Sequence, residues 1–422
     1  MIAEIIAAGS EMLTPFRQDT NSLYLTSKLN ELGVSVGFKT IVGDNLEHLT
    51  GAARIAVSRA DIVIFSGGLG PTEDDLTREA AAATLGLELR RDNDLLAAIY
   101  RRFAARRMAM PQNNARQADV IQGAQVLANA NGSAPGQYID TVVGKYRKIV
   151  ILLPGPPKEL KAMYEAECEP KLRASLPERH IAKRMLRMAL IPESQVDART
   201  SLIYKQYSDV ETTILAGAGE IQLHFSCSKA SAAQAQARVD ELAGRVEQEM
   251  GEAVFSSHGE SLEEMVLLML GLRHMTLAAA ESCTGGLLAQ RLTAIPGSSR
   301  YFLGGAVVYA DRLKTIFADV PEETVKIEGP VSEEVARQMA DGIRERTGAS
   351  VGVSITGIAG PTLGTGPDAE KPIGLVYIGI SFADDFLTKV VELNLSGDRE
   401  RIRLWASQHA LELLRRRLLE RV

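Results

Sequence analysis

Hydrophobic and polar positions along this chain predict three consecutive domains. In the first, residues 1–170, short apolar stretches alternate with longer stretches of helical periodicity: residues 2–8, 21–32, 34–42, 46–60 and 61–65. This alternation is typical of βαβ units around a parallel sheet. A closing strand over 148–153 runs into Pro154-Gly155-Pro156-Pro157. Because prolines end a strand and are tolerated in the first turn of a helix, we expect a helix to follow.

The pattern changes over residues 180–258. A small α+β module is predicted there, with strands at 185–191, 211–215 and 220–226, helices at 193–207 and 232–250, and a short strand at the end. Ser261 and Glu264 then form a capping-box pattern before an apolar helix over 262–272. The third domain, residues 260–422, has predicted strands at 276–280, 305–309, 350–355, 374–380 and 389–395 and a last helix from Arg399.

Composition and charge narrow the class of function. With 45% hydrophobic and 24% charged residues, the 422-residue chain has a typical globular composition, and no stretch of about 18 apolar residues predicts a membrane span. The three cysteines are far apart, which excludes a disulfide framework and paired zinc-ligand spacing. A net charge of −6 disfavours a polyanion as main partner. Because the first residues lack signal-peptide features, we expect a cytoplasmic protein that acts on small molecules without a membrane partner.

A serine before two glycines is the first candidate for chemistry. The segment Ala280-Glu281-Ser282-Cys283-Thr284-Gly285-Gly286 leaves a predicted strand and enters a helix. Backbone N–H groups at such a corner can surround a ligand and form an oxyanion hole, with the Ser282 hydroxyl as nucleophile. Two alternatives stay open. Ser282 or Thr284 can simply cap the helix, and Cys283 can be the nucleophile because a helix N-terminus stabilises a thiolate.

Four further motifs follow in order. They are Tyr309 with Lys314 five residues later, Thr356-Gly357-Ile358-Ala359-Gly360-Pro361, Lys371-Pro372-Ile373-Gly374 and Gly397-Asp398-Arg399-Glu400. The glycine-rich corner at 356–361 suits backbone contact with ribose or phosphate, and Arg399 can pair with phosphate or lie at a helix start as a surface charge. With the serine segment, these motifs resemble the C-terminal domain of the CinA family. That domain is related to stand-alone nicotinamide-mononucleotide deamidases.

The resemblance implies hydrolysis of nicotinamide mononucleotide to nicotinate mononucleotide and ammonia, without a cofactor. Ser282 would be the nucleophile, Lys314 the general base and Tyr309 a proton relay or orienting group. Because a lysine loses its proton near neutral pH when it is held out of water, we expect Lys314 to be partly buried. Substrate binding would fall to Cys283, Thr284, Gly285, Gly286, Thr356, Gly357, Ala359, Gly360 and Arg399. The loop at 362–370 is longer than the usual turn of the family and is expected to alter the rim of the pocket.

The first domain has a polar corner of its own. Ser66-Gly67-Gly68-Leu69-Gly70-Pro71-Thr72-Glu73-Asp74-Asp75 follows the strand 61–65 and precedes a helix. Glycines after a strand let phosphate approach backbone N–H groups, and paired carboxylates can hold a divalent cation that bridges phosphate oxygens. The alternative is a plain turn with a charged helix start.

This corner and neighbouring motifs resemble the N-terminal domain of the CinA family. The other motifs are Gly9-Ser10-Glu11-Met12-Leu13, Asp19-Thr20-Asn21, Val42-Gly43-Asp44 and 153–159. The resemblance implies a three-layer, molybdopterin-binding-like fold and metal-dependent hydrolysis of ADP-ribose to AMP and ribose 5-phosphate. Implied binding residues are Gly67, Gly68, Gly70, Pro71, Thr72 and Asn21, and implied ligands of a divalent metal are Asp74, Asp75, Glu11, Asp19 and Asp44.

The same resemblance implies that the middle segment is KH-like and that the protein is a homodimer. Because residues 180–258 contain no GXXG tetrapeptide and their charges roughly balance, we do not expect nucleic-acid binding. The fold expected overall is α/β, with a deamidase domain after the KH-like module. The alternative function is a molybdopterin-binding or competence- and DNA-damage-linked regulatory protein without hydrolase activity.

Overall fold

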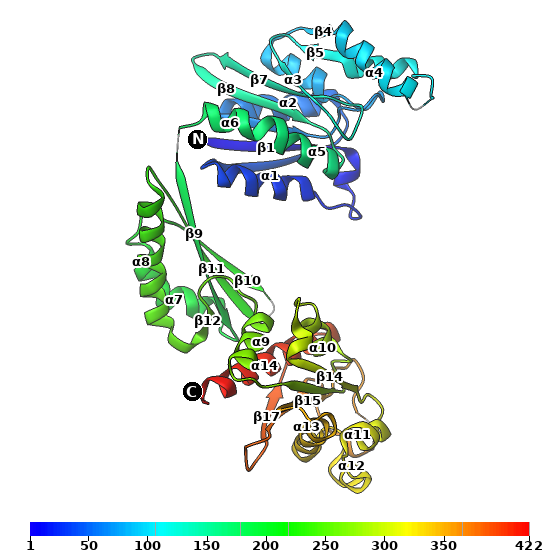
Figure 1. The fold of residues 1–422 in the computed structure, drawn as a ribbon, viewed down its shortest axis with the longest axis vertical. Helices are drawn as coiled ribbons and strands as arrows, with labels where there is room; N and C mark the ends of the chain where they lie inside the picture. Colours follow the sequence, from blue (N-terminus) through cyan, green and yellow to red (C-terminus); the bar gives the residue numbers. More distant parts are fainter. Residues whose placement is uncertain (106, 178, 218, 365, 422) are drawn as a thin grey trace. The chain divides into compact units, whose positions relative to one another are not determined.

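The computed structural model describes residues 1–105, 107–177, 179–217, 219–364 and 366–421 (Figure 1). These residues form two compact units, one of Met1–Ile181 with Ser228–Ala235 and one of Ala182–Cys227 with Gln236–Val422. Among the helices in these described ranges, none combines the length and the apolar character that crossing a bilayer requires.

The first unit is built around a six-stranded sheet. Its strand order is β2-β1-β3-β8-β7-β6, with β2 (Ser35–Val42), β1 (Ile2–Ala8), β3 (Ile62–Ser66), β8 (Tyr146–Leu153), β7 (Gly136–Val143) and β6 (Gln125–Leu127). The first four strands are parallel, as the alternating pattern predicted, whereas β7 and β6 pair antiparallel at one edge. These two edge strands were not predicted from the sequence.

Helices cover both faces of this sheet and make the three layers that were expected. Successive residues of β1 point to opposite faces of the sheet. On one face, Ile6 packs with α2 (Leu46–Arg59) and α3 (Thr77–Leu85). On the other face, Ile5 packs with α1 (Thr20–Glu31), α5 (Pro157–Met163) and α6 (Glu169–Ser175). As predicted, α5 begins with proline in its first turn. The unit also contains α4 (Asn93–Ala105), the pair β4 (Leu89–Arg91) and β5 (Asp119–Ile121), and the short turns η1 (Ser10–Leu13), η2 (Gln112–Ala118) and η3 (Tyr164–Cys168).

The middle segment has a sheet of its own. Its strand order is β10-β11-β9-β12, with β10 (Glu211–Gly217), β11 (Glu220–Lys229), β9 (His180–Ala189) and β12 (Val254–Ser256). The helices α7 (Glu193–Tyr204) and α8 (Ala232–Met250) and the turn η4 (Gly251–Ala253) complete it. The predicted α+β pattern is confirmed.

The C-terminal segment contains a five-stranded sheet of order β14-β13-β15-β16-β17. The strands are β14 (Phe302–Val307), β13 (Leu277–Glu281), β15 (Val351–Gly357), β16 (Leu375–Phe382) and β17 (Lys389–Asn394). The first three are parallel, and β16 and β17 are antiparallel. The carboxyl ends of β13, β14 and β15 therefore meet at one edge of the sheet, where ligands commonly bind in α/β folds.

Two helical layers cover this sheet. One core packs α9 (Leu262–Leu272), α10 (Leu287–Thr293) and α14 (Arg399–Leu419) on one face, and another packs α11 (Asp311–Ala318), α12 (Glu322–Glu328) and α13 (Glu333–Thr347) on the other. Short turns lie at η5 (Ser298–Arg300) and η6 (Gly366–Asp368). The predicted capping box is present, since Ser261 Oγ accepts the Glu264 N–H and the Glu264 carboxylate accepts the Ser261 N–H.

One strand differs from its prediction. The strand expected at 305–309 runs instead from Phe302 to Val307, so Tyr309 lies in the loop after it. Close packing requires glycine at position 305 of this strand, because a Cβ there would lie 1.9 Å from the Ala279 carbonyl oxygen. Tyr309 consequently leaves the sheet and turns toward the ligand edge.

Candidate functional site

A cavity of about 270 Å³ lies at the carboxyl edge of the C-terminal sheet. The predicted residues that line it are Ser282, Cys283, Tyr309, Lys314, Gly357, Ala359, Gly360 and Arg399. They come from the loops after β13, β14 and β15 and from the starts of α11 and α14. The fold thus brings the proposed nucleophile, base and orienting tyrosine into one cavity.

Lys314 is buried, as its proposed role requires, with 2% of its surface exposed. Its Nζ donates to Asp311 Oδ1 at 3.1 Å and to the Val308 carbonyl at 3.5 Å. Within the described part of the chain these oxygens, and not Ser282, are its hydrogen-bond acceptors. Because the Asp311 carboxylate stabilises an ammonium, Lys314 must leave this partner before it can take a proton from the serine.

The serine loop is held by the residue before it. The Glu281 side chain is buried and accepts hydrogen bonds from the N–H groups of Gly286 (3.1 Å), Leu288 (3.0 Å) and Ala289 (2.8 Å). The Ser282 N–H donates to Ile355 O at 2.9 Å. The Glu281 carboxylate therefore already occupies the anion site expected at this helix start. It interacts with the dipole of the helix and accepts hydrogen bonds from N–H groups at the helix N-terminus.

Cys283 lies in the same cavity wall but in an environment unsuited to a thiolate. Burial raises the pKa of the Cys283 thiol to about 12, and the neighbouring Glu281 carboxylate adds to the rise. The helix dipole that favours a thiolate is screened here by Glu281. This geometry disfavours the alternative in which Cys283 is the nucleophile.

Arg399 and Tyr309 form a contact across the mouth of the cavity. Arg399 donates through Nη2 to the Tyr309 hydroxyl at 2.9 Å and through Nη1 to the Gly360 carbonyl at 2.6 Å. Tyr309 is 58% exposed. The guanidinium thus joins three of the predicted segments, and a phosphate that binds it would compete with these two oxygens.

Four predicted binding residues lie outside the cavity lining: Thr284, Gly285, Gly286 and Thr356. The carbonyl of Thr284 accepts two hydrogen bonds from Arg403, at 3.2 and 2.7 Å. The N–H of Gly285 donates to Ser282 O at 3.0 Å, and the Thr356 hydroxyl donates to Pro330 O at 2.7 Å. These groups hold the loops together and so are not directed at a ligand.

The longer loop at 362–370 lines the cavity, as expected, through Thr362, Gly364 and Asp368. Asp368 is buried, accepts the Val331 N–H at 3.1 Å and pairs with Lys371 at 2.7 Å. Lys371 also donates to Val331 O at 2.7 Å. Asp368 is not among the residues predicted from the sequence. Its position three residues before Lys371, the lysine of the motif at 371–374, is the feature that could have indicated it.

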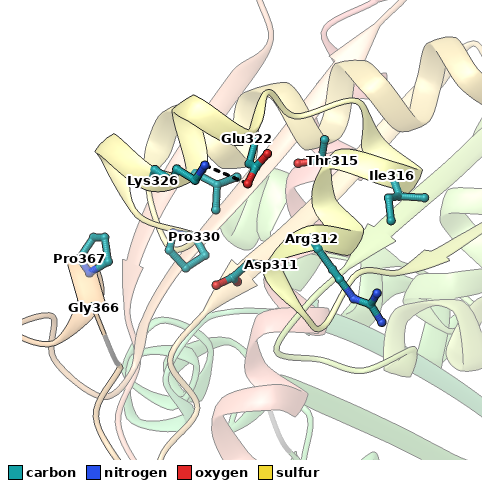
Figure 2. Close-up of a pocket in the computed structure, with 10 residues that line it drawn as sticks. Asp311, Arg312, Thr315, Ile316, Glu322, Lys326, Pro330, Gly366 and Pro367 are labelled. Atoms are coloured by element: carbon teal, nitrogen blue, oxygen red, sulfur yellow. Dashed lines mark ion pairs between the residues drawn. The ribbon is translucent and has the colours of Figure 1, made fainter.

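A second cavity, of about 530 Å³, adjoins the first and shares Asp311 and Pro330 with it. Figure 2 shows Glu322 and Lys326 of α12, paired at 2.9 Å, on one side, and Asp311 at the start of α11 on another. Asp311 is therefore the boundary between the two cavities. It was missed from the sequence, although it lies one helical turn before Lys314.

The first unit contains a cavity of about 630 Å³ at the carboxyl ends of β1, β3 and β8. The predicted residues that line it are Glu11, Asn21, Asp44, Gly67, Gly68, Gly70, Pro71, Thr72, Asp74 and Asp75. Residues of the motif at 153–159 line it too, together with the unpredicted Arg17, Gln18, Gln117 and Ser133. Segments far apart in the chain thus meet as the motifs indicated.

The glycine-rich loop of this cavity is tightly packed. Gly67 has φ +101°, and a Cβ there would lie 2.4 Å from the Ala8 carbonyl oxygen, so glycine is required. The buried Arg78 donates to Leu69 O at 2.8 Å and to Gly70 O at 2.9 Å. The loop therefore has a fixed shape before any ligand binds.

The acidic residues of this unit have different environments. Asp75 accepts hydrogen bonds from the N–H of Thr72, at 2.8 Å, and from its hydroxyl. Asp44 accepts the Ser10 N–H at 2.7 Å. Asp19 does not line the cavity, because it caps α1 by accepting the Ser22 N–H at 2.9 Å.

The described residues contain no group of three histidine, cysteine, aspartate or glutamate side chains arranged around a metal position. Mg²⁺ in phosphate sites is usually held by one or two carboxylates, waters and substrate phosphate oxygens. Asp74 and Asp75, beside the glycine loop, suit that mode of binding, with Glu11 and Asp44 in the same lining. Asp19 does not.

Protein-family comparisons match three parts of the chain. Residues 4–174 match the model described as a probable molybdopterin binding domain, 183–256 the damage-inducible protein CinA KH domain, and 259–418 the CinA C-terminal domain. The three matched segments follow one another along the chain without overlap.

Curated relatives are similar over the whole length. A CinA-like protein of Acidobacterium capsulatum is 57% identical over 419 residues, which are 99% of this chain and 100% of that protein. A CinA-like protein of Koribacter versatilis is 56% identical over the same coverage. A putative competence-damage inducible protein of Caldicellulosiruptor bescii is 40% identical over 420 residues, which are 100% of both chains.

Solved structures match part of the chain. The crystal structure of the CinA protein of unknown function from Thermoplasma acidophilum is 34% identical, covers 40% of this chain and 97% of its own, and has a TM-score of 0.37. The competence damage-inducible protein A of Klebsiella pneumoniae is 29% identical, covers 38% of this chain and 98% of its own, and has a TM-score of 0.35.

Proposed function

Because this chain belongs to the CinA family, we propose that its C-terminal domain is an amidohydrolase that converts nicotinamide mononucleotide and water to nicotinate mononucleotide and ammonia. One observation carries the proposal. Ser282, Tyr309, the buried Lys314 and Arg399, which are separated by up to 117 positions in the sequence, line a single cavity. A hydroxyl, a buried amine and an arginine in one cavity can supply the nucleophile, the base and the phosphate contact that an acyl-transfer site for a phosphorylated substrate requires.

In the proposed reaction, Lys314 leaves Asp311 and gives up its ammonium proton to solvent, and the neutral amine then accepts the hydroxyl proton of Ser282. Ser282 Oγ then attacks the carboxamide carbon and forms a tetrahedral intermediate. As the C–N bond breaks, Lys314 returns the proton to the leaving nitrogen and ammonia departs. Water, activated by the same lysine, attacks the resulting ester and releases the carboxylate and free Ser282.

The negative oxygen of the intermediate needs hydrogen-bond donors. In the serine loop, the N–H groups of Ser282, Gly285 and Gly286 already bond to Ile355, Ser282 and Glu281. Of the loop residues that line the cavity, Cys283 is the one whose N–H group has no such bond, so this N–H group is the proposed oxyanion donor. Arg399 would bind the substrate phosphate in exchange for its bonds to Tyr309 and Gly360.

The deamidase proposal is tested by incubating the full-length protein with nicotinamide mononucleotide and measuring ammonia. Ser282→Ala is expected to lower kcat by about 10³-fold or more, and Cys283→Ala to leave it within a few-fold of the parent. Full activity of the serine variant would overturn the assignment. A folded parent protein that releases no ammonia would overturn the activity itself.

For the N-terminal domain we propose metal-dependent hydrolysis of the diphosphate of ADP-ribose to AMP and ribose 5-phosphate. The shaped glycine loop beside Asp74 and Asp75 supports this activity, because N–H groups and carboxylate-held cations both neutralise phosphate. When bound, a divalent cation would stabilise negative charge on the diphosphate. Formation of AMP from ADP-ribose, assayed by chromatography, tests the proposal.

The match of residues 4–174 to a probable molybdopterin binding domain favours a second candidate for this cavity, namely binding of a pterin phosphate without hydrolysis. That function concerns the N-terminal cavity alone and leaves the proposed deamidase activity of the C-terminal domain unchanged. Absence of AMP formation in a protein that binds a pterin phosphate would favour it over the pyrophosphatase.

A further inference from the structure

An exposed segment borders the N-terminal cavity. It connects η1 to α1, and its residues Arg17 and Gln18 line the cavity. Arg17 has no hydrogen-bond or ion-pair partner in the part of the chain that the structure describes. Other arginines around this cavity are already engaged: Arg78 donates to two carbonyls of the glycine loop, and Arg116 donates to Thr72 O and pairs with Glu79. Arg17 is thus available to a ligand.

The charge of the cavity makes this cation significant. Among its described lining residues, five are carboxylates and one, Arg17, is cationic; the carboxylates are Glu11, Asp44, Asp74, Asp75 and Glu159. A phosphate ligand would meet strong repulsion from these carboxylates unless cations offset it. A bound divalent cation can offset part of that repulsion, and Arg17 is placed to offset the rest.

Asn21 lies four residues after Arg17, in the first turn of α1, and has an unfilled acceptor. The residue is 3% exposed, and its Nδ2 donates to Ser66 Oγ at 3.0 Å and to the Gly155 carbonyl at 2.7 Å. These bonds define the orientation of the amide, because a carbonyl oxygen can only accept. They leave Oδ1 buried in the cavity wall without a hydrogen-bond partner among the described residues. An orphaned buried acceptor of this kind is costly unless a ligand or water donates to it.

We propose that Arg17 and Asn21 together recognise a phosphorylated sugar, and that Arg17 binds the phosphate while Asn21 Oδ1 accepts a hydrogen bond from a sugar hydroxyl. The ligand class is a nucleoside diphosphate linked to a sugar. This inference rests on the proposed function of the N-terminal cavity. It adds Arg17 to the binding residues and gives Asn21, which was already expected to bind substrate, the role of selecting the sugar. A guanidinium suits a phosphate because it can donate two parallel hydrogen bonds.

Calorimetric titration of the full-length protein in Mg²⁺ buffer separates the two contacts. The probes are α,β-methylene ADP-ribose, which cannot be cleaved at the diphosphate, and inorganic pyrophosphate, which has no sugar and therefore no sugar hydroxyl groups. Arg17→Ala is expected to raise Kd about 10-fold to 100-fold for both probes. Asn21→Ala is expected to raise Kd about 10-fold for the sugar-containing probe and less than about twofold for pyrophosphate.

Arg54→Ala is the matched control, because Arg54 is an exposed arginine on α2 of the same unit that does not line the cavity. Unchanged binding by Arg17→Ala would overturn the phosphate contact, and equal weakening of both probes by Asn21→Ala would reduce Asn21 to a structural role. Tight binding by the parent without cleavage of ADP-ribose would refute the proposed hydrolysis alone. Failure of the parent to bind either probe would refute this inference and the proposed function together.

Discussion

The Lys314 ammonium lies 3.1 Å from the carboxylate of Asp311, and this pair joins a buried cation to a residue at the boundary of two cavities. Lys314 is almost fully buried, whereas the Asp311 side chain is 59% exposed. The buried ammonium of Lys314 thus bonds to a solvent-accessible carboxylate, and substrate or Ser282 can replace this carboxylate as its partner. Asp311 holds the Lys314 Nζ that the proposed reaction requires at Ser282, so the two residues compete for this group.

Asp311→Asn is expected to increase the deamidation rate at pH 7 by about twofold to fivefold. A partly exposed ion pair contributes about 0.2–1 kcal/mol, and its loss removes the partner that competes with Ser282 for the Lys314 Nζ. Initial rates of ammonia release measure the effect. The control is Asp319→Asn, which removes the Asp319–Arg346 surface pair of the same segment and should leave the rate unchanged. A slower Asp311 variant would mean that the carboxylate positions Lys314 productively.

Lys314→Met should lower kcat by about 10²-fold to 10⁴-fold, because a general base contributes that much to proton transfer. The fold should survive, since methionine fills the same buried space without an ammonium that needs partners. Steady-state kinetics and a thermal melt test both statements. Lys326→Met, at an exposed position of α12, is the matched change and should retain activity. Retained activity in Lys314→Met would exclude the lysine as base.

Cys283 should resist alkylation in the folded protein. With a pKa raised to about 12, its thiol stays protonated at pH 8, and the reactive thiolate is correspondingly scarce. Iodoacetamide at pH 8 should modify Cys283 at least about 100-fold more slowly in the native than in the urea-unfolded protein. Peptide mass spectrometry gives the two rates. Rapid labelling of the native protein, with loss of deamidation, would revive the cysteine nucleophile.

Glu281→Ala should destabilise the C-terminal segment by roughly 2–3 kcal/mol, because the N–H groups of the N-cap Gly286 and of two residues in α10 lose their buried acceptor. Urea unfolding followed by fluorescence reports on this segment directly, since Trp405 in α14 is the one tryptophan of the sequence. Glu264→Ala removes an exposed capping carboxylate from α9 and should cost only about 1 kcal/mol. Equal losses in the two variants would show that burial of Glu281 adds nothing.

Removal of divalent metal should separate the two proposed activities. EDTA is expected to abolish AMP formation from ADP-ribose, because the carboxylates around Asp74 repel phosphate without a cation, and to leave ammonia release within about twofold. Both products can be followed in one sample before and after Mg²⁺ is restored. Metal-independent AMP formation would contradict the proposed role of Asp74 and Asp75.

Local patterns in the sequence predicted most of the helices and strands. Apolar periodicity predicted the bounds of β1, α2 and β3 to within one residue, and the capping box at Ser261 predicted the start of α9, because these features depend on residues adjacent in the chain. The edge strands β6 and β7 were not found, since an antiparallel edge is defined by the partner strand and not by its own pattern.

For the site, the sequence by itself determined which segments carry polar chemistry and that they would meet where parallel strands end. Only the tertiary structure decided which groups are free to act. It buries Lys314 against Asp311, fills the N-terminus of α10 with Glu281, and assigns Asp19 to a helix cap. The physical reason is that each donor and acceptor bonds to whichever partner the fold brings near, and that burial, which decides whether a charge or an orphaned oxygen is costly, is a property of long-range packing.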